Sequence, residues 1–160
     1  MEQWIEEILD KMKATLKSCP CKEDGEWAKE RLCDGLGAVS GYDAWSEKGP
    51  IRIDIWFEKD GNSVAIETEV SAISASHDLL KLAYVKPDIA FLVLNDLDSG
   101  TGPRRSTFER LTSRIRTLRS CRSNEHLARA FQELKIIVIG VRYKDETAEI
   151  PYEVKHEVFL

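Results

Sequence analysis

Apolar residues recur at helical spacing along much of the chain, and this recurrence predicts where helices form. In residues 2–17, apolar side chains make one continuous stripe along the expected helix. Glycines at 35 and 37 end the second helical stretch. We expect helices over residues 2–17, 24–34, 75–85, 104–120 and 125–134. The last two are separated by a break near Ser123 and Asn124.

Strand periodicity is clearest in residues 51–58, where every second residue is apolar. We expect one face of this strand to carry Ile51, Ile53, Ile55 and Phe57, and the other to carry Arg52, Asp54, Trp56 and Glu58. Residues 63–70 alternate in the same way. The intervening Asp60-Gly61 pair is typical of a tight hairpin, so the two strands should be antiparallel neighbours.

The remaining strands are expected in the second half of the chain. Residues 88–94 are almost continuously apolar, which indicates a parallel strand covered on both faces. Residues 135–143 form another buried strand, and residues 149–160 are expected to add an edge strand. Residues 36–50 are predicted as a loop with a first strand. The order of elements implies an α/β fold with one mixed sheet.

Length and composition fit a single globular domain. The chain has 160 residues, of which 42% are hydrophobic and 32% are charged. No apolar run approaches the roughly 18–20 residues that a membrane helix needs. Residues 1–4 lack the basic and then apolar order of a signal peptide, so we expect a cytoplasmic protein.

The four cysteines favour free thiols over a metal site. Cys19 and Cys21 are close together, whereas Cys33 and Cys121 stand alone. Structural zinc sites usually show two tight pairs, which this spacing does not provide. We expect Cys33 and Cys121 to pack in helices, with a zinc or iron–sulfur site as the less favoured interpretation.

The hairpin register predicts an acidic cluster. If Lys59 pairs with Asn62, paired residue numbers sum to 121, and Asp54 then lies opposite Glu67 while Arg52 lies opposite Glu69. Opposed side chains have Cβ atoms roughly 4.5–5.5 Å apart, and like charges at that spacing destabilise a sheet. A divalent cation would offset the repulsion. The alternatives are a solvated face, or neutralisation by Arg52 and Lys81.

Asp54, followed by Glu67-Thr68-Glu69 on the next strand and by a helix, resembles the PD-(D/E)XK nuclease superfamily over residues 24–95. The resemblance implies a restriction-endonuclease-like mixed central sheet flanked by helices. It also implies that Asp54 and Glu67 bind Mg²⁺ or Mn²⁺. Glu69 replaces the usual lysine, as in members where it is a further metal ligand or a base for water. Lys81 would supply the lysine from the following helix.

The resemblance extends to further residues and partners. Many members contribute a glutamate from the first core helix, where Glu30 is the best match and Glu26 the second. Small members commonly dimerise, so a homodimer that cuts DNA is expected. The chain would then be one nuclease-like domain, 1–160, with an N-terminal helix, a core, an Arg-rich helical segment and C-terminal strands at 1–22, 24–95, 104–134 and 135–160. The alternative is a nuclease-like module that binds nucleic acid without catalysis.

A basic segment lies within this acidic chain. The formal net charge is −5, which excludes a simple basic nucleic-acid coat but not an enzyme with a local basic patch. Eight of 11 arginines and two glutamates fall within residues 104–129, giving +6 there (8 minus 2) and −11 elsewhere (−5 minus 6). The expected phosphate contacts are Arg104, Arg105, Arg110 and Arg114. The alternative is a solvated helix that forms salt bridges.

Overall fold

The computed structural model describes residues 1–18, 26–46, 49–69, 72–95, 106–143 and 152–160. The helices within these ranges are α1 (Gln3–Ser18), α2 (Glu26–Leu36), α3 (Ala72–Val85), α4 (Thr107–Arg119) and α5 (Glu125–Glu133). The strands are β1 (Val39–Ser46), β2 (Gly49–Lys59), β3 (Asn62–Glu69), β4 (Ile89–Asn95), β5 (Ile136–Tyr143) and β6 (Tyr152–Phe159).

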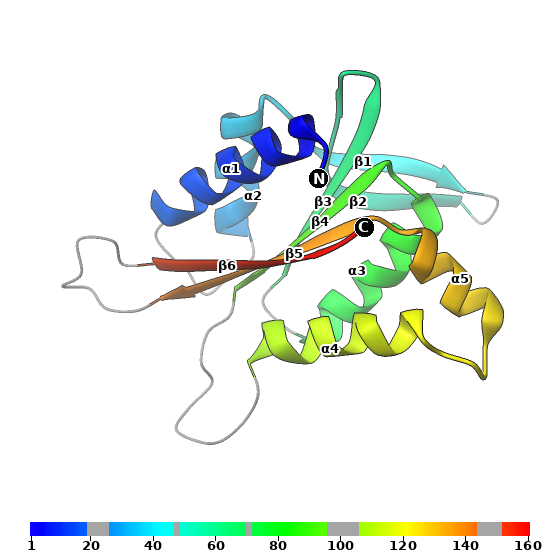
Figure 1. Cartoon of the computed structure of the whole chain (residues 1–160). Helices are drawn as coiled ribbons and strands as arrows, with labels where there is room; N and C mark the ends of the chain where they lie inside the picture. Colours follow the sequence, from blue (N-terminus) through cyan, green and yellow to red (C-terminus); the bar gives the residue numbers. More distant parts are fainter. Residues whose placement is uncertain (19–25, 47–48, 70–71, 96–105, 144–151) are drawn as a thin grey trace.

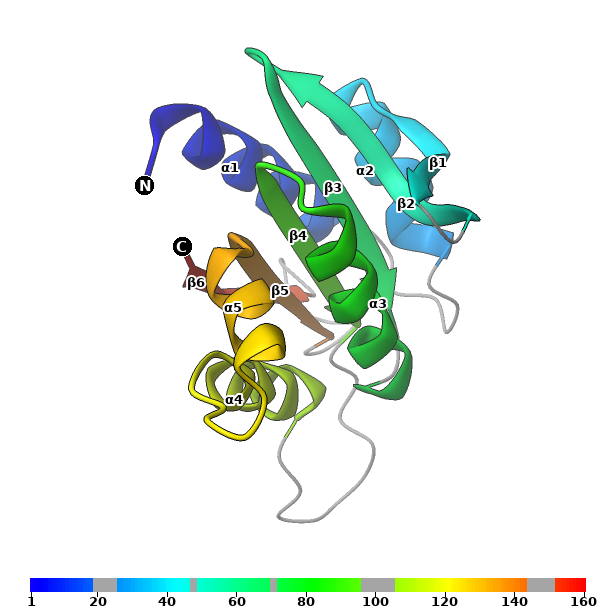
Figure 2. The same cartoon turned by 90° about the vertical axis from the view of Figure 1, so that its right-hand side faces the viewer.

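All six strands belong to one mixed sheet, in the order β1-β2-β3-β4-β5-β6. The first three strands are antiparallel neighbours, β3, β4 and β5 run parallel, and β6 is antiparallel to β5 at the edge. Helices α1 and α2 cover one face of the sheet, and α3, α4 and α5 cover the other (Figures 1 and 2). The predicted α/β fold, with one mixed sheet flanked by helices, is therefore confirmed.

Burial explains why the sheet has a helical layer on each face. Every residue of β4 is buried, as expected for a parallel strand covered on both sides. Phe91 and alternate residues of β4 pack with Met12 and Leu16 of α1, in what we call the α1-side core. Leu92 packs on the opposite face with Leu79 of α3, in the α3-side core. Removing these apolar surfaces from water is the main stabilising contribution.

The predicted helices are all present, with shifted ends. Helix α4 begins at Thr107 rather than near residue 104, because Ser106 and Glu109 form a capping box. Asn124 caps α5 by accepting a hydrogen bond from the Leu127 N–H, which accounts for the predicted break between the two helices.

The predicted tight hairpin is present between β2 and β3. Asp60 and Gly61 have positive φ values of 53° and 79°, as a two-residue turn of this kind requires. The register runs from Lys59↔Asn62 to Ile55↔Ile66, so each pair sums to 121 as expected. The ladder ends at that last pair. The predictions that Asp54 pairs with Glu67, and Arg52 with Glu69, are therefore wrong, because β2 separates from β3 before reaching them.

The predicted faces of β2 are also wrong for half of the strand. Ile53 is buried in the α3-side core, whereas Ile55, two residues later, is buried in the α1-side core. A regular strand would keep both on one face. The change occurs around Asp54. In β1, Gly41, with φ of 72°, falls between the residues that pair with Ile55 and Ile53. Here β1 and the first half of β2 curl away from the rest of the sheet (Figure 1).

Cys33 and Cys121 are free thiols, while Cys19 and Cys21 lie outside the described residues. Cys33 packs from α2 against the α1-side core, as predicted. Cys121 follows the end of α4, so the prediction that it lies in a helix is wrong. None of the described helices combines the length and the apolar character needed to cross a membrane.

Candidate functional site

A buried carboxylate and a lysine meet where β2 leaves β3. Glu67 lies one residue beyond the last β2–β3 pair, and its side chain is 1% exposed. Lys81 of α3 places its Nζ 2.7 Å from Glu67 Oε1. The same Nζ lies 2.7 Å from Asp78 Oδ1, one helical turn earlier, and donates to the Arg52 main-chain oxygen at 3.3 Å. One ammonium group thus contacts two carboxylates and a carbonyl.

Burial dominates the electrostatics of Glu67. Loss of water raises its pKa to about 8, although the Lys81 ammonium acts in the opposite direction. The charges of Asp78 and Asp54 raise the pKa further. Burial alone would lower the pKa of Lys81, but the two adjacent carboxylates raise it overall. Lys81 is therefore held in its charged form between them.

Two oxygen atoms of this cluster are buried without a hydrogen-bond partner among the described residues. They are Glu67 Oε1, which has its ion pair with Lys81, and Asp78 Oδ2. Buried polar atoms normally find partners, so these two mark a place where a cation or a donor could be added. Sequence reasoning did not assign a role to Asp78. The feature of the sequence that could have identified it is its i, i+3 spacing from Lys81, which places both side chains on one face of a helix.

Asp54 lies on β2, and its side chain is held by hydrogen bonds from β3, the strand from which β2 separates. Its Oδ2 accepts hydrogen bonds from the Thr68 main-chain N–H and Oγ1, each at 3.0 Å. Lys29 of α2 lies 3.3 Å from Oδ1. Burial would raise the pKa of Asp54, but the Thr68 hydrogen bonds and the Lys29 charge outweigh it and hold that pKa below its ordinary value. Asp54 is therefore ionised.

The structure brings part of the predicted acidic cluster together. Asp54 contacts the residue that follows Glu67, and its charge acts on the Glu67 pKa. Glu69, two residues along β3, shares the Glu67 side of the strand by alternation and is half-buried. Lys81 neutralises Glu67, as one alternative anticipated, whereas Arg52 contributes only a main-chain oxygen.

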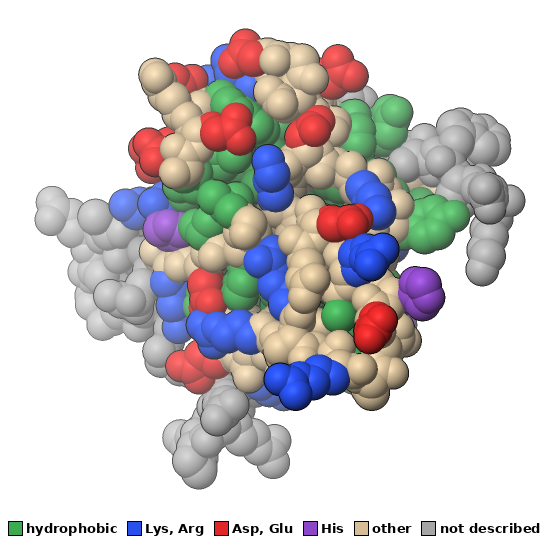
Figure 3. Space-filling view, turned by 45° about the vertical axis from the view of Figure 1, so that its right-hand side comes forward, with side chains coloured by type: hydrophobic (Ala, Val, Ile, Leu, Met, Phe, Trp, Pro, Cys, Tyr) green, Lys and Arg blue, Asp and Glu red, His purple; other side chains and the backbone are tan. Residues whose placement is uncertain are grey.

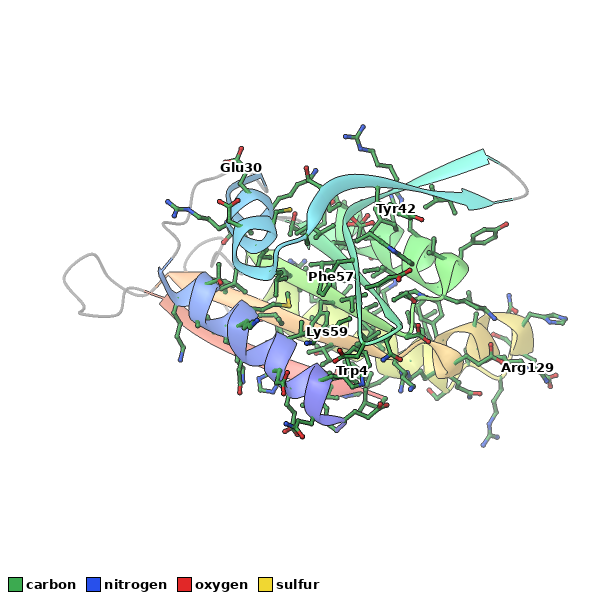
Figure 4. The ribbon with its side chains drawn as sticks, turned by 90° about the horizontal axis from the view of Figure 1, so that it is seen from above. Trp4, Glu30, Tyr42, Phe57, Lys59 and Arg129 are labelled. Atoms are coloured by element: carbon green, nitrogen blue, oxygen red, sulfur yellow. The ribbon has the colours of Figure 1, made fainter. Side chains whose placement is uncertain are left out.

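Other predicted members of the site do not join it. Glu30 is exposed on the outer side of α2 (Figure 4), and its neighbour Lys29 is the α2 residue that contacts Asp54. The side chain of Glu26 lies outside the described part of the molecule. Within that described part, no three or more His, Cys, Asp or Glu side chains are grouped so as to hold a metal ion.

Two of the predicted phosphate-binding arginines lie beside the helix that carries Lys81. Arg110 and Arg114 are exposed on α4, and Arg114 Nη1 donates to Ser76 Oγ of α3 at 3.0 Å. Together with His77 they line a groove of about 680 Å³ between α3, α4 and α5. The floor of this groove is apolar. Arg104 and Arg105 lie outside the described residues.

The remaining arginines of this segment have different surroundings. Arg116 pairs with Glu157 of β6. Arg119 donates through Nη2 to the main-chain oxygens of Leu134 and Phe159, at 2.6 and 3.0 Å. On the face drawn in Figure 3, Lys and Arg side chains are interspersed with Asp and Glu rather than forming one continuous basic stripe. The helix arginines are thus divided between structural and exposed positions.

Fold and site together define an α/β protein with a buried carboxylate–lysine cluster where two strands of its mixed sheet separate. Comparison of the chain with protein-family models, with curated proteins and with solved structures gives no match. Functional assignment therefore depends on the chemistry of the site itself.

Proposed function

We propose that the chain is a nuclease that uses a divalent metal ion, Mg²⁺ or Mn²⁺, to hydrolyse phosphodiester bonds in DNA. The observation that carries the proposal is the buried carboxylate of Glu67 beside Asp54, at the separation of β2 and β3. Apart from its ion pair with Lys81, Glu67 Oε1 has no hydrogen-bond partner among the described residues. Carboxylate oxygens are the protein ligands that Mg²⁺ prefers.

The residues present fit such an ion in charge and in donor type. Asp54 and Glu67 would hold it, and Glu69 would be a third ligand or a base for water. A divalent cation at this place supplies Lewis-acid activation of the attacking water and the phosphate. Thr68 orients Asp54 through two hydrogen bonds, and the Lys81 ammonium provides fixed positive charge beside Glu67.

The order of elements supports the finer fold prediction. Helix α2 precedes the β2–β3 hairpin, and α3 and β4 follow it, as in the helix–strand–turn–strand–helix context of the PD-(D/E)XK resemblance. The proposed fold is therefore restriction-endonuclease-like. Arg110 and Arg114 beside α3 are suited to phosphate oxygens, which supports DNA as the substrate. The homodimer rests on the resemblance alone.

A second candidate function has its own supporting observation. Lys29 and Lys81 already neutralise Asp54 and Glu67, and glutamate occupies the position at which the superfamily usually has lysine. These features favour a nuclease-like module that binds nucleic acid without cutting it. Metal-dependent cleavage separates the two candidates.

The test is cleavage of a panel of duplex, single-stranded and branched DNA with Mg²⁺ or Mn²⁺. Glu67→Gln and Asp54→Asn should each lower the rate by about a hundredfold or more, as expected for groups at the reacting centre. The matched control is Glu58→Gln, an exposed residue of β2, which should cut like the wild type. All variants are compared for their thermal unfolding by circular dichroism.

The outcomes distinguish the candidates. DNA binding without cleavage by the wild type would replace the nuclease with the non-catalytic module. Cleavage that survives both substitutions would place the chemistry elsewhere. Absence of both cleavage and binding would reject both functions.

A further inference from the structure

Asp78 is a buried carboxylate that neither the motif nor the proposed metal site includes. We propose that Asp78 is a positioning residue that holds the Lys81 ammonium against Glu67. Its consequence for catalysis rests on the proposed nuclease function, whereas its effect on Lys81 rests on geometry alone.

Three oxygen atoms from three different residues surround the ammonium group. Lys81 Nζ lies 2.7 Å from Asp78 Oδ1, 2.7 Å from Glu67 Oε1 and 3.3 Å from the Arg52 oxygen. An ammonium has three donors, and these three oxygen atoms lie around it at short distance. A lysine side chain has about 2 kcal/mol of rotamer entropy to lose, and several simultaneous contacts are needed to fix it.

The burial of Asp78 shows that this is not an ordinary surface pair. Its side chain is 5% exposed, whereas that of Lys81 is 33% exposed. The chain also contains a pair with the same i, i+3 spacing whose carboxylate is 79% exposed, Asp10 and Lys13 on α1, at 3.8 Å. Such surface pairs contribute only about 0.2–0.5 kcal/mol. A carboxylate excluded from water instead needs its partner, since an unpaired buried charge is strongly destabilising.

Helix α3 also determines the direction in which Lys81 points. Residues three apart lie on the same face of a helix, so Asp78 restrains Lys81 from its own helix while Glu67 attracts it from β3. Without Asp78, the ammonium keeps one charged partner and gains freedom toward the solvent to which it is partly exposed. Positive charge beside Glu67 would then be less precisely placed.

The experiment compares Asp78→Asn with Asp78→Glu and with the matched control Asp10→Asn. The first readout is the rate at which an amine-acetylating reagent modifies Lys81. The folded protein is labelled without metal, and the modification of Lys81 is then measured by mass spectrometry of its peptides. We expect several-fold faster modification in Asp78→Asn, an intermediate rate in Asp78→Glu, and the wild-type rate in Asp10→Asn. An unchanged rate in folded Asp78→Asn would overturn the proposal.

The second readout is steady-state cleavage of DNA with Mg²⁺. We expect kcat to fall by about tenfold or more in Asp78→Asn with KM little changed, because a misplaced charge affects the reacting state more than binding. Partial recovery of kcat is expected in Asp78→Glu. A normal kcat despite faster labelling would overturn the catalytic consequence.

Two further outcomes keep the results separable. If Asp78→Asn does not fold, Asp78→Glu replaces it in the test, since it retains the charge and displaces it by one methylene. A labelling rate and a kcat equal to those of the wild type in Asp78→Glu would then overturn the proposal. If the wild type does not cut DNA, the nuclease proposal fails, and the labelling rate still decides whether Asp78 positions Lys81.

Discussion

Glu67 lies in an environment very different from that of a free glutamate side chain. It belongs to a strand in which residues 64–68 are all buried, so its carboxylate is removed from water together with them. Desolvation raises its pKa to about 8 even though Lys81 lies within ion-pair distance. The free energy of unfolding must therefore depend on pH through this group.

The sign of that dependence follows from the direction of the shift. The Glu67 pKa in the folded state, about 8, exceeds its ordinary value of 4.5, so the folded state retains the proton longer. As pH rises from about 4.5 to about 8, the unfolded state is favoured progressively by ionisation. Glu67→Gln abolishes this loss, so its stability relative to the wild type should increase across that range.

The measurement is urea unfolding of both proteins without divalent metal at several pH values in that range. The exposed Glu58→Gln variant controls for loss of a negative charge. A stability difference between Glu67→Gln and wild type that stays constant with pH would contradict the expected titration.

At the scale of elements, α4, which carries several of the arginines, is positioned by close packing against β5. A Cβ atom built on Gly140 would lie 2.8 Å from Phe108 Cδ2 and 3.1 Å from Cγ. Real Cβ atoms do not approach other atoms so closely, so the absence of a side chain at this residue lets α4 pack against the strand. Phe108 is 8% exposed and belongs to the α3-side core.

We therefore expect Gly140→Ala to destabilise the protein by about 1–3 kcal/mol, the usual cost of overpacking a core. Chemical denaturation with urea measures the loss. Phe108→Leu removes ring atoms from the contact. The double variant Gly140→Ala/Phe108→Leu should therefore be destabilised by less than the sum of the losses in the two single variants. Strict additivity would indicate that the two side chains do not compete for the same space.

At the scale of the whole molecule, a net charge of −5 is combined with a cationic segment. Some arginines of this segment make structural contacts, and others are exposed. Arg119 joins α4 to the end of α5 and to β6 through main-chain oxygens, and its guanidinium lies 5.4 Å from the centre of the Phe159 ring. Arg110 and Arg114 are exposed beside α3 and make no ion pair with a described residue. Of these three arginines, Arg110 and Arg114 are the ones that remain available for a phosphate backbone.

Replacing Arg110 and Arg114 together by glutamine should therefore weaken DNA binding and its dependence on salt. Each lost phosphate contact lowers the slope of log K against log salt concentration by about 0.9 for duplex DNA, so the double variant should lose about 1.8. Fluorescence anisotropy at several salt concentrations measures the slope. The matched control is the exposed pair Arg122 and Arg129, changed in the same way; equal losses in both double variants would contradict a localised contact surface.

Local patterns were sufficient to predict the helices, the strands and their approximate order. Periodicity identified α1 and the buried strand β4, and the Asp60-Gly61 turn determined the hairpin register. These features depend on residues close together in the chain, whose side chains alternate or repeat with the backbone. The acidic residues of the candidate site, Asp54 and Glu67, were selected from that same register.

The partners of those residues were decided by tertiary structure. The bend of β2 at Asp54 moves its carboxylate onto Thr68 and Lys29, and the packing of α3 brings Asp78 and Lys81 to Glu67. The Asp54–Thr68 and Glu67–Lys81 contacts have no local signature, because each joins residues 14 positions apart. The i, i+3 spacing of Asp78 and Lys81 is local, but it does not show that this side of α3 faces the sheet. The sequence by itself determined the elements and their acidic residues. Strand divergence and helix packing decided which charges meet, because these arise from burying both faces of one twisted sheet.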